Sequence, residues 1–258
     1  MSDEGLLDLA VAIAVEAGDL LLERFHSDAT GIETKSTPTD LMSDADRDSE
    51  ALVLDRIKGA RSDVGVIAEE SDDQTSRSGV TWIIDPLDGT VNFLFGIPVW
   101  AVSIAIHDSV GPLIGVVHDP NHKETFAAQR GLGSRLNGGS VMVSSKDDIS
   151  TALVGTGFSY EAETRKAQAA RIPKVLPRVR DLRRAGSAAI DLAWLACGRL
   201  DGFFEAPMKL WDRAAGEILI SEAGGVITSL TAPFDDDEGV IASGPSLHDQ
   251  LKDLVLGS

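Results

Sequence analysis

WIIDPLDGTVNF, residues 82–93, joins an apolar run to two aspartates and a tight turn. The apolar run predicts a short buried strand, and Pro86 and Gly89 force the chain to turn just beyond it. Asp85 and Asp88 are therefore expected at the end of a strand. Because a carboxylate is costly to bury alone, two of them at the edge of a core require a cation or a cluster of donors nearby.

The composition predicts a folded protein that does not bind polyanions. With 258 residues, 43% of them hydrophobic, the chain can bury a core as one large domain or two tightly joined lobes. Its formal net charge of −18 argues against nucleic acid or an anionic membrane as a main partner. The single cysteine, Cys197, excludes an intrachain disulfide, and no basic leader or membrane-spanning run is evident. We therefore expect a cytoplasmic protein.

The first half of the chain has the pattern of an α+β fold. Helical periodicity predicts helices over 5–25 and 43–58, the second of them opened by Ser43 and Asp46 in capping-box spacing. Strands are predicted at 64–68, 81–85, 99–107 and 112–119. Segments 124–129 and 134–143 resemble hairpin strands, with a turn at Asn137 and Gly138.

The second half alternates strands and helices and predicts a sheet covered on both faces. Strands are expected at 151–156, 201–206, 226–230 and 239–243, and helices at 162–178, 187–198 and 211–225. A lobe boundary is placed near 145–150. Lysines and arginines cluster between 165 and 184, where we expect a solvated helix face, and the acidic turn at 234–239 is expected to be a solvated loop.

Three acidic clusters follow apolar strands or begin helices. They contain Glu69 and Glu70, Asp85 and Asp88, and Asp212. Any one of these acids alone would be read as a helix cap or a surface ion pair. Three such clusters favour a metal site, and ligation by oxygen alone suits Mg²⁺ or Mn²⁺ better than zinc.

Gly89 and Thr90 suggest the other half of the chemistry. A glycine allows the backbone to approach an anion, and the amides after a turn can bind phosphate. The Thr90 hydroxyl can hold an attacking water if a carboxylate accepts its proton, and Asp46 is the candidate. The same Asp46 can instead serve only as a helix cap, and the sequence leaves both roles open.

These motifs resemble the Mg²⁺-dependent, lithium-sensitive phosphatases typified by inositol monophosphatase. WIIDPLDGTVNF and WDRAAGEILISEAGG (211–225) are similar to the two signatures of that family. Segments 35–46, 65–71 and 183–205 match in order around them, so the resemblance covers nearly the whole chain. It implies a layered α-β-α-β-α sandwich, as in inositol monophosphatase and fructose-1,6-bisphosphatase. Residues 1–258 would form one phosphatase domain, with an α+β lobe over about 1–148 that carries the metal and phosphate sites, and an α/β lobe over about 149–258.

The resemblance also implies a role for each site residue. Two or three Mg²⁺ ions, for which Mn²⁺ can substitute, would be held by Glu69, Asp85, Asp88, Asp212 and the main-chain carbonyl of Leu87. Thr90 and Asp46 would activate water, with Glu70 supporting a neighbouring metal or water. The amides of Gly89 and Thr90 would hold the phosphate, while Asp88, Gly186, Ser187, Ala188 and Glu205 would line the sugar pocket.

The substrate expected by resemblance is inositol 1-phosphate or a similar small polyol phosphate. Asn92 fits the inositol-type pattern, whereas nucleotide-phosphate relatives tend to carry an acid there. Histidinol-phosphate phosphatase, fructose-1,6-bisphosphatase and nucleotide 3′-phosphatase are the alternatives within the superfamily. A non-catalytic relative that binds a metal or a regulatory partner is the alternative outside enzymology. The family also implies a homodimer.

Overall fold

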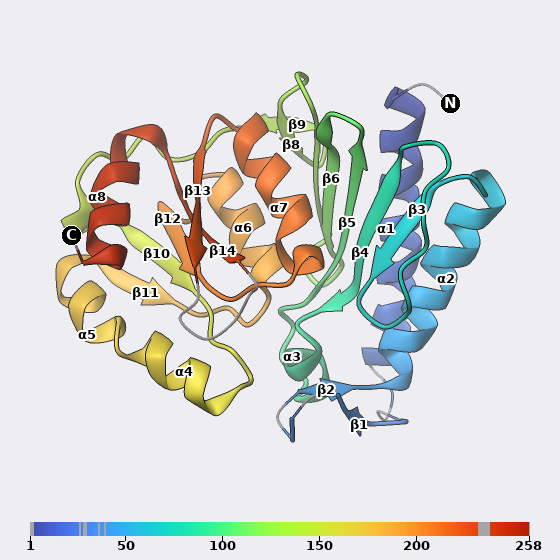
Figure 1. The fold of residues 1–258 in the computed structure, drawn as a ribbon, viewed down its shortest axis with the longest axis horizontal. Helices are drawn as coiled ribbons and strands as arrows, with labels where there is room; N and C mark the ends of the chain where they lie inside the picture. Colours follow the sequence, from blue (N-terminus) through green and yellow to red (C-terminus); the bar gives the residue numbers. More distant parts are fainter. Residues whose placement is uncertain are drawn as a thin grey trace.

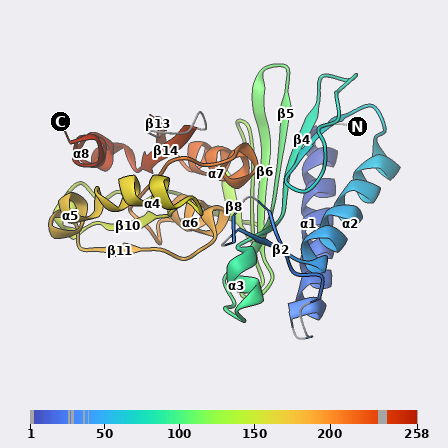
Figure 2. The ribbon, with the colours of Figure 1, turned by 60° about the horizontal axis from the view of Figure 1, so that its bottom comes forward.

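Two large β-sheets and three helical layers alternate through the described structure (Figures 1 and 2). The computed structural model describes residues 3–25, 27, 30–35, 37–38, 40–231 and 238–257. In Figure 1 the layers run from α8 through a five-stranded sheet, α6 and α7, and a seven-stranded sheet to α1 and α2. The layered α-β-α-β-α sandwich expected from the sequence is therefore confirmed.

Helices α1 (Asp3–Phe25) and α2 (Asp44–Ala60) form one outer layer, close to the ranges predicted from helical periodicity. The predicted capping box is present at the start of α2: Asp46 Oδ2 accepts hydrogen bonds from the Ser43 amide at 2.8 Å and from Ser43 Oγ at 2.7 Å. These bonds fix the first turn of α2 and hold Asp46 in a buried position.

The seven-stranded sheet contains every strand predicted for the first half of the chain. Its strands, in spatial order, are β3 (Gly65–Ala68), β4 (Thr81–Asp88), β5 (Ala101–Asp108), β6 (Gly111–Asp119), β7 (Glu124–Gln129), β8 (Ser134–Leu136) and β9 (Gly139–Val141). Only β3 and β4 pair in parallel. The predicted turn joins β8 to β9, and both Asn137 and Gly138 have positive φ, as a two-residue hairpin turn requires.

Strand β4 is buried on both faces, which explains its uninterrupted apolar run. Trp82 and Ile84 pack into the core beneath α1 and α2. Ile83 faces the opposite way, into the core formed with α6 (Ala188–Ala196) and α7 (Leu210–Glu222). A strand between two helical layers carries apolar residues on both sides of its pleat.

Helix α7 lies directly on the backbone of β6, because Gly115 leaves room for it. A Cβ atom at Gly115 would lie 2.2 Å from Ile218 Cγ2 and 2.5 Å from the Ala215 carbonyl oxygen. This close approach sets the position of the first turn of α7, which carries Asp212.

The second sheet is covered on both faces, as predicted, and has five strands, of which β11 (Asp181–Arg183) was not among the four expected. In spatial order the five strands are β11, β10 (Leu153–Thr156), β12 (Gly202–Glu205), β14 (Glu238–Ser243) and β13 (Val226–Thr231). Phe203 packs toward α6 and α7, and the adjacent Phe204 packs toward α8 (Pro245–Leu256) on the other face. The acidic turn expected at 234–239 lies outside the described residues, apart from Glu238 and Gly239.

Two expectations for the second half were wrong or incomplete. The single helix predicted over 162–178 is divided into α4 (Ala162–Ala169), α5 (Ile172–Val175) and the 3₁₀ turn η2 (Leu176–Arg178). Pro173 and Pro177 explain the division, because proline has no amide hydrogen to donate within a helix. Helix α8 was not predicted, although Leu247, Leu251 and Leu254 form its buried face at helical spacing.

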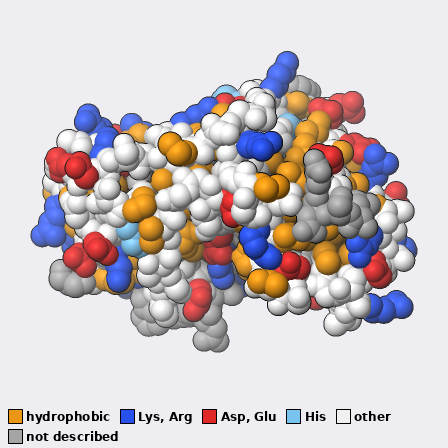
Figure 3. Space-filling model, turned by 90° about the horizontal axis from the view of Figure 1, so that it is seen from above, with side chains coloured by type: hydrophobic (Ala, Val, Ile, Leu, Met, Phe, Trp, Pro, Cys, Tyr) orange, Lys and Arg blue, Asp and Glu red, His pale blue; other side chains and the backbone are white. Residues whose placement is uncertain are grey.

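Shorter elements complete the described chain. They are the hairpin of β1 (Glu33–Thr34) and β2 (Leu41–Met42), the helix α3 (Thr90–Leu94) and the 3₁₀ turn η1 (Ile149–Thr151). On the face drawn in Figure 3, basic and acidic side chains are interspersed. In the described ranges, no helix is both long enough and apolar enough to span a bilayer.

Candidate active site

The candidate site begins where β4 leaves its sheet. The pairing of β4 with β5 is irregular between Asp85 and Asp88, which turns both carboxylates out of the ladder. The Leu87 amide donates to Asp85 Oδ1 at 3.0 Å. Gly89 has a φ of +99°, and a Cβ atom there would lie 3.0 Å from the Val99 carbonyl oxygen. The turn therefore requires glycine at this position.

Segments that are distant in sequence meet around this turn in one pocket. The predicted site residues that line it are Glu69, Asp85, Leu87, Asp88, Gly89, Thr90, Gly186, Ser187, Ala188, Glu205 and Asp212. They come from the loop after β3, the end of β4, the start of α6, the end of β12 and the first turn of α7. Asp46 and Glu70 do not line this pocket.

The carboxylates in the pocket repel one another. Burial raises the pKa of Asp85 well above its usual value, and the charges of Glu69, Asp88 and Asp212 raise it further. Burial, followed by the charges of Asp88 and Glu69, likewise raises the pKa of Asp212. A divalent cation bound among these groups would relieve both the repulsion and the cost of burial.

Asp88 joins this cluster to the start of α6. Its Oδ2 atom accepts hydrogen bonds from Ser187 Oγ at 2.5 Å and from the Ala189 amide at 2.6 Å. Burial raises the pKa of Asp88 to about 6, although the bonds from Ser187 and Ala189 oppose that rise. Ser187 also caps α6, since its Oγ accepts from the Ile190 amide at 3.2 Å.

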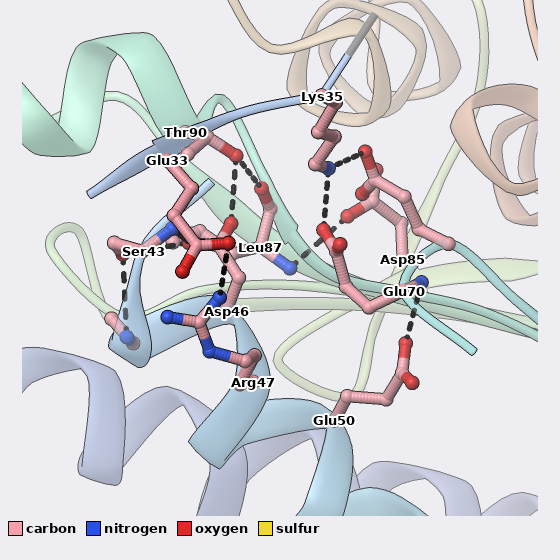
Figure 4. A network of polar contacts seen from close by, with 12 residues as sticks. Glu33, Lys35, Ser43, Asp46, Arg47, Glu50, Glu70, Asp85, Leu87 and Thr90 are labelled. Atoms are coloured by element: carbon pink, nitrogen blue, oxygen red, sulfur yellow. Dashed lines mark hydrogen bonds and ion pairs between the residues drawn. The ribbon is translucent and has the colours of Figure 1, made fainter. Parts of the chain in front are cut away.

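Asp46 reaches the pocket through Thr90. Thr90 Oγ1 lies 2.9 Å from Asp46 Oδ1, to which it donates, and 3.0 Å from the Leu87 carbonyl oxygen (Figure 4). The other Asp46 oxygen holds the capping box at Ser43. Asp46 therefore caps α2 and also accepts a hydrogen bond from Thr90.

Lys35 is a residue of this region that the sequence analysis missed. Its ammonium lies 2.6 Å from Glu69 Oε1 and also contacts the Glu70 carboxylate (Figure 4). Burial and the charge of Glu69 raise the pKa of Glu70 to about 7, against the opposing effect of Lys35. Lys35 opens the segment 35–46 that resembles the family, but the resemblance gave it no role, and a polar loop without a periodic pattern does not predict which acids it contacts.

Asp191 is a second residue that was missed. It lies in the first turn of α6, is 2% exposed, and lines the same pocket as Glu205. Burial raises the pKa of Asp191 to about 8, and burial together with the Asp191 charge raises the pKa of Glu205 to about 8. A lone carboxylate within the otherwise apolar run 188–196 was the available signal.

The donor set fits a hard divalent cation. It consists of carboxylate and carbonyl oxygens, as Mg²⁺ and Mn²⁺ prefer, and one of the acids, Glu69, already contacts the Lys35 ammonium. In the part of the chain that the structure describes, no three such side chains already form a complete metal-binding group. The Lys35 ammonium contacts Glu69 Oε1, so a cation bound at that oxygen would compete with it.

The chain is similar to known proteins over most of its length. The chain matches the Inositol monophosphatase family over residues 2–256. It is 37% identical over 262 residues to Nus factor SuhB of Escherichia coli strain K12, covering 97% of this chain and 98% of that protein. It is 39% identical over 231 residues to an inositol-1-monophosphatase of Mycobacterium bovis, covering 85% and 79% of the two chains.

Solved structures of similar proteins have the same fold. The extragenic suppressor protein suhB of Bartonella henselae superposes with a TM-score of 0.91 at 32% identity, covering 97% of this chain and 98% of that one. The inositol monophosphatase of Anabaena superposes with a TM-score of 0.86 at 33% identity, covering 98% and 96%. The resemblance seen in the two sequence motifs is therefore confirmed, and the chain belongs to the inositol monophosphatase family.

Proposed function

We propose that this protein is a Mg²⁺-dependent phosphomonoesterase that hydrolyses inositol 1-phosphate or a similar small polyol phosphate to the alcohol and inorganic phosphate. The observation that carries the proposal is the gathering of Glu69, Asp85, Asp88 and Asp212 in one pocket beside Thr90. Membership of the family supports the same reaction class.

The metal ligands would be the four carboxylates and the Leu87 carbonyl, for two or three Mg²⁺ ions, with Mn²⁺ as a substitute. When bound, the ions supply Lewis acids that lower the pKa of water and offset the charge of the phosphate ester. No cationic side chain needs to take that second role, which explains how a protein with a net charge of −18 accepts an anionic substrate.

The chain's own residues would position the attacking water and the phosphate. Because Thr90 donates its proton to Asp46, the lone pairs of Thr90 Oγ1 remain available to accept a hydrogen bond from water. Glu70, whose pKa is raised to about 7 by burial and by Glu69, would support a neighbouring water. The amides of Gly89 and Thr90 would hold the phosphate, as the family resemblance implies.

The alcohol end of the substrate would lie against Glu205 and residues 186–188. Gly157 leaves space for the Glu205 carboxyl group, since a Cβ atom there would lie 2.1 Å from Glu205 Oε2. Asn92 fixes the neighbouring loop, because its Nδ2 donates to the carbonyl oxygens of Val99 at 2.7 Å and Ala185 at 2.9 Å. An amide at position 92 keeps the inositol-type pattern.

A second candidate is a regulatory role exerted by binding a partner. The name Nus factor, carried by relatives from Escherichia coli and Xylella fastidiosa, favours it. The basic cluster at 165–184, which extends over α4, α5 and β11, offers one surface for such a role.

Phosphate release separates these possibilities. The panel contains inositol 1-phosphate, histidinol phosphate, fructose 1,6-bisphosphate and a nucleoside 3′-phosphate, each measured with Mg²⁺ and with EDTA. The proposal predicts Mg²⁺-dependent release, fastest from inositol 1-phosphate. Preference for histidinol phosphate would replace the substrate assignment, and no release from any member of the panel would leave the regulatory role.

A further inference from the structure

Asp191 is a buried carboxyl group that the proposed reaction does not use. The Ala185 amide donates to its carboxyl group, but its Oδ1 atom is buried and has no hydrogen-bond partner. An unpartnered acceptor of this kind is costly, because it has lost its water without gaining a bond. Since Asp191 also lines the pocket, a ligand is well placed to supply the missing donor.

Two glycines of the neighbouring chain lie beside Asp191 and Glu205. A Cβ atom at Gly155 in β10 would lie 3.6 Å from Asp191 Oδ1, in ordinary contact, and 2.9 Å and 3.0 Å from the Leu200 and Phe203 side chains. A Cβ atom at Gly157, two residues further on, would overlap the Glu205 carboxyl group, so glycine is needed there. The two carboxyl groups act on each other electrostatically and line one end of the same pocket. Together they present neighbouring acceptor groups to a ligand.

Arg184 decides which kind of donor fits this end. It lines the pocket, and its positive charge lowers the pKa of both Asp191 and Glu205. An ammonium or imidazolium group on the substrate would have to approach this guanidinium. A neutral polyol has no such conflict, because its hydroxyls donate to carboxylates and also accept from Arg184.

We propose that Asp191 is a specificity-determining residue that accepts a hydrogen bond from a hydroxyl of a neutral polyol phosphate, beside the hydroxyl bound by Glu205. This assignment rests on the proposed phosphatase function. Asp191 would be a second carboxyl group that binds the polyol, beside Glu205. Arg184 next to them would disfavour substrates that carry a cationic group at that end.

The test compares Asp191→Leu, which removes the acceptor, with Asp191→Asn, which keeps one acceptor oxygen. The quantity measured is the ratio of kcat/KM for inositol 1-phosphate to that for p-nitrophenyl phosphate, which carries no hydroxyl. A general defect in folding cancels in this ratio. We expect it to fall by about tenfold to a hundredfold in Asp191→Leu, mainly through KM, and by less in Asp191→Asn.

Asp201→Asn is the matched control. Asp201 is also a buried aspartate, but it binds the Leu153 amide at 2.8 Å and does not line the pocket. It is expected to leave the substrate ratio unchanged. A ratio that stays constant in Asp191→Leu would overturn the specificity assignment while leaving the phosphatase proposal intact.

Calorimetric titration makes the test independent of turnover. Inositol 1-phosphate and inorganic phosphate are titrated into the wild type, Asp191→Leu and Asp201→Asn. We expect Asp191→Leu to weaken binding of inositol 1-phosphate by at least about tenfold relative to inorganic phosphate. Equal weakening for both ligands, or no binding of inositol 1-phosphate to the wild type, would contradict the assignment. Binding that depends on Asp191 without phosphate release would instead refute the phosphatase function alone.

Discussion

Thr90 Oγ1 donates a hydrogen bond to Asp46 Oδ1 across 2.9 Å, joining the turn after β4 to the first turn of α2. Both side chains are buried, and Asp46 has no exposed surface. Because the opposite Asp46 oxygen is held by Ser43, the direction of the Thr90 hydroxyl is fixed by the cap of a helix. The residue that caps α2 therefore also orients the hydroxyl proposed to position the attacking water.

This pair predicts a loss of turnover without a matching loss of binding. Thr90→Ala is expected to lower kcat by about a hundredfold or more while KM changes little, because only the attacking water loses its partner. Asp46→Asn should act on the same step, so the double variant is expected to be no slower than the more impaired single one. Additive losses in steady-state phosphate release, or an equal loss in KM, would assign Thr90 to holding phosphate instead.

The position of Lys35 suggests that its ammonium and a metal ion compete for the Glu69 carboxylate. Lys35→Met removes the ammonium from Glu69 and Glu70 and leaves two acids facing each other. We expect the metal-free protein to lose about 1–3 kcal/mol of unfolding free energy, less than for a fully buried pair because Lys35 is partly exposed.

The same variant should bind Mg²⁺ more tightly by calorimetry, since Glu69 no longer has to exchange partners. Lys58→Met, on the exposed face of α2, is the control and should change neither quantity. Unchanged Mg²⁺ affinity in Lys35→Met would show that the ammonium does not compete for Glu69.

How much of this could be predicted from sequence differs between residues. The turn that carries Asp85 and Asp88 could be predicted, because an apolar run, a proline and a glycine follow one another within a few residues. Helix α8 could have been predicted from the spacing of Leu247, Leu251 and Leu254. The contact of Lys35 with Glu69 could not be predicted, because it joins a polar loop to an acid more than 30 positions away in the sequence. Only the fold brings the two residues together.

Asp191 lies between these cases. Its apolar surroundings marked it as unusual, but whether each oxygen of a buried acid has a donor depends on the fold around it. At Asp191 the Ala185 amide in the preceding loop supplies one donor, and Oδ1 has none. The break in the helix predicted over 162–178 is of a different kind, since Pro173 and Pro177 stood in the sequence. Each proline removes an amide hydrogen from the segment, and these losses outweigh its helical composition.

The contact between α7 and β6 predicts a large effect from a single methyl group. Gly115→Ala would place a Cβ atom 2.2 Å from Ile218 Cγ2, so α7 must shift or the strand must bend. We expect a loss of about 1–3 kcal/mol or more in unfolding free energy. Gly59→Ala is the control: it lies in α2 with nothing near its Cβ position and should stabilise by about 0.5–1 kcal/mol. Urea denaturation measures both, and similar values for the two would refute the packing argument.

From the ion pair of Asp108 and Arg130 we expect part of the loss of folding stability at low pH. The bonds from Arg130 lower the pKa of Asp108 to about 2, with help from the Val110 and Gly111 amides. Because this folded-state pKa lies below the ordinary value of 3.8, the pair stabilises the fold above about pH 4 and loses that contribution as pH falls toward 2.

Asp108→Asn should therefore be less stable than the wild type at neutral pH, and the difference should shrink between pH 4 and 2. Asp253→Asn, on the exposed side of α8, should follow the wild type throughout. A difference that stays constant across this range in pH-dependent thermal unfolding would show that the ion pair does not carry the effect.

The most direct measurement is an anomalous difference map from crystals soaked in Mn²⁺, collected for the wild type and for Asp85→Asn. Strong peaks are expected among Glu69, Asp85, Asp88 and Asp212 in the wild type, and weaker or no peaks in the variant, with the fold unchanged. A wild-type map with no peak in that pocket, from crystals that bind Mn²⁺ elsewhere, would contradict the proposed metal site.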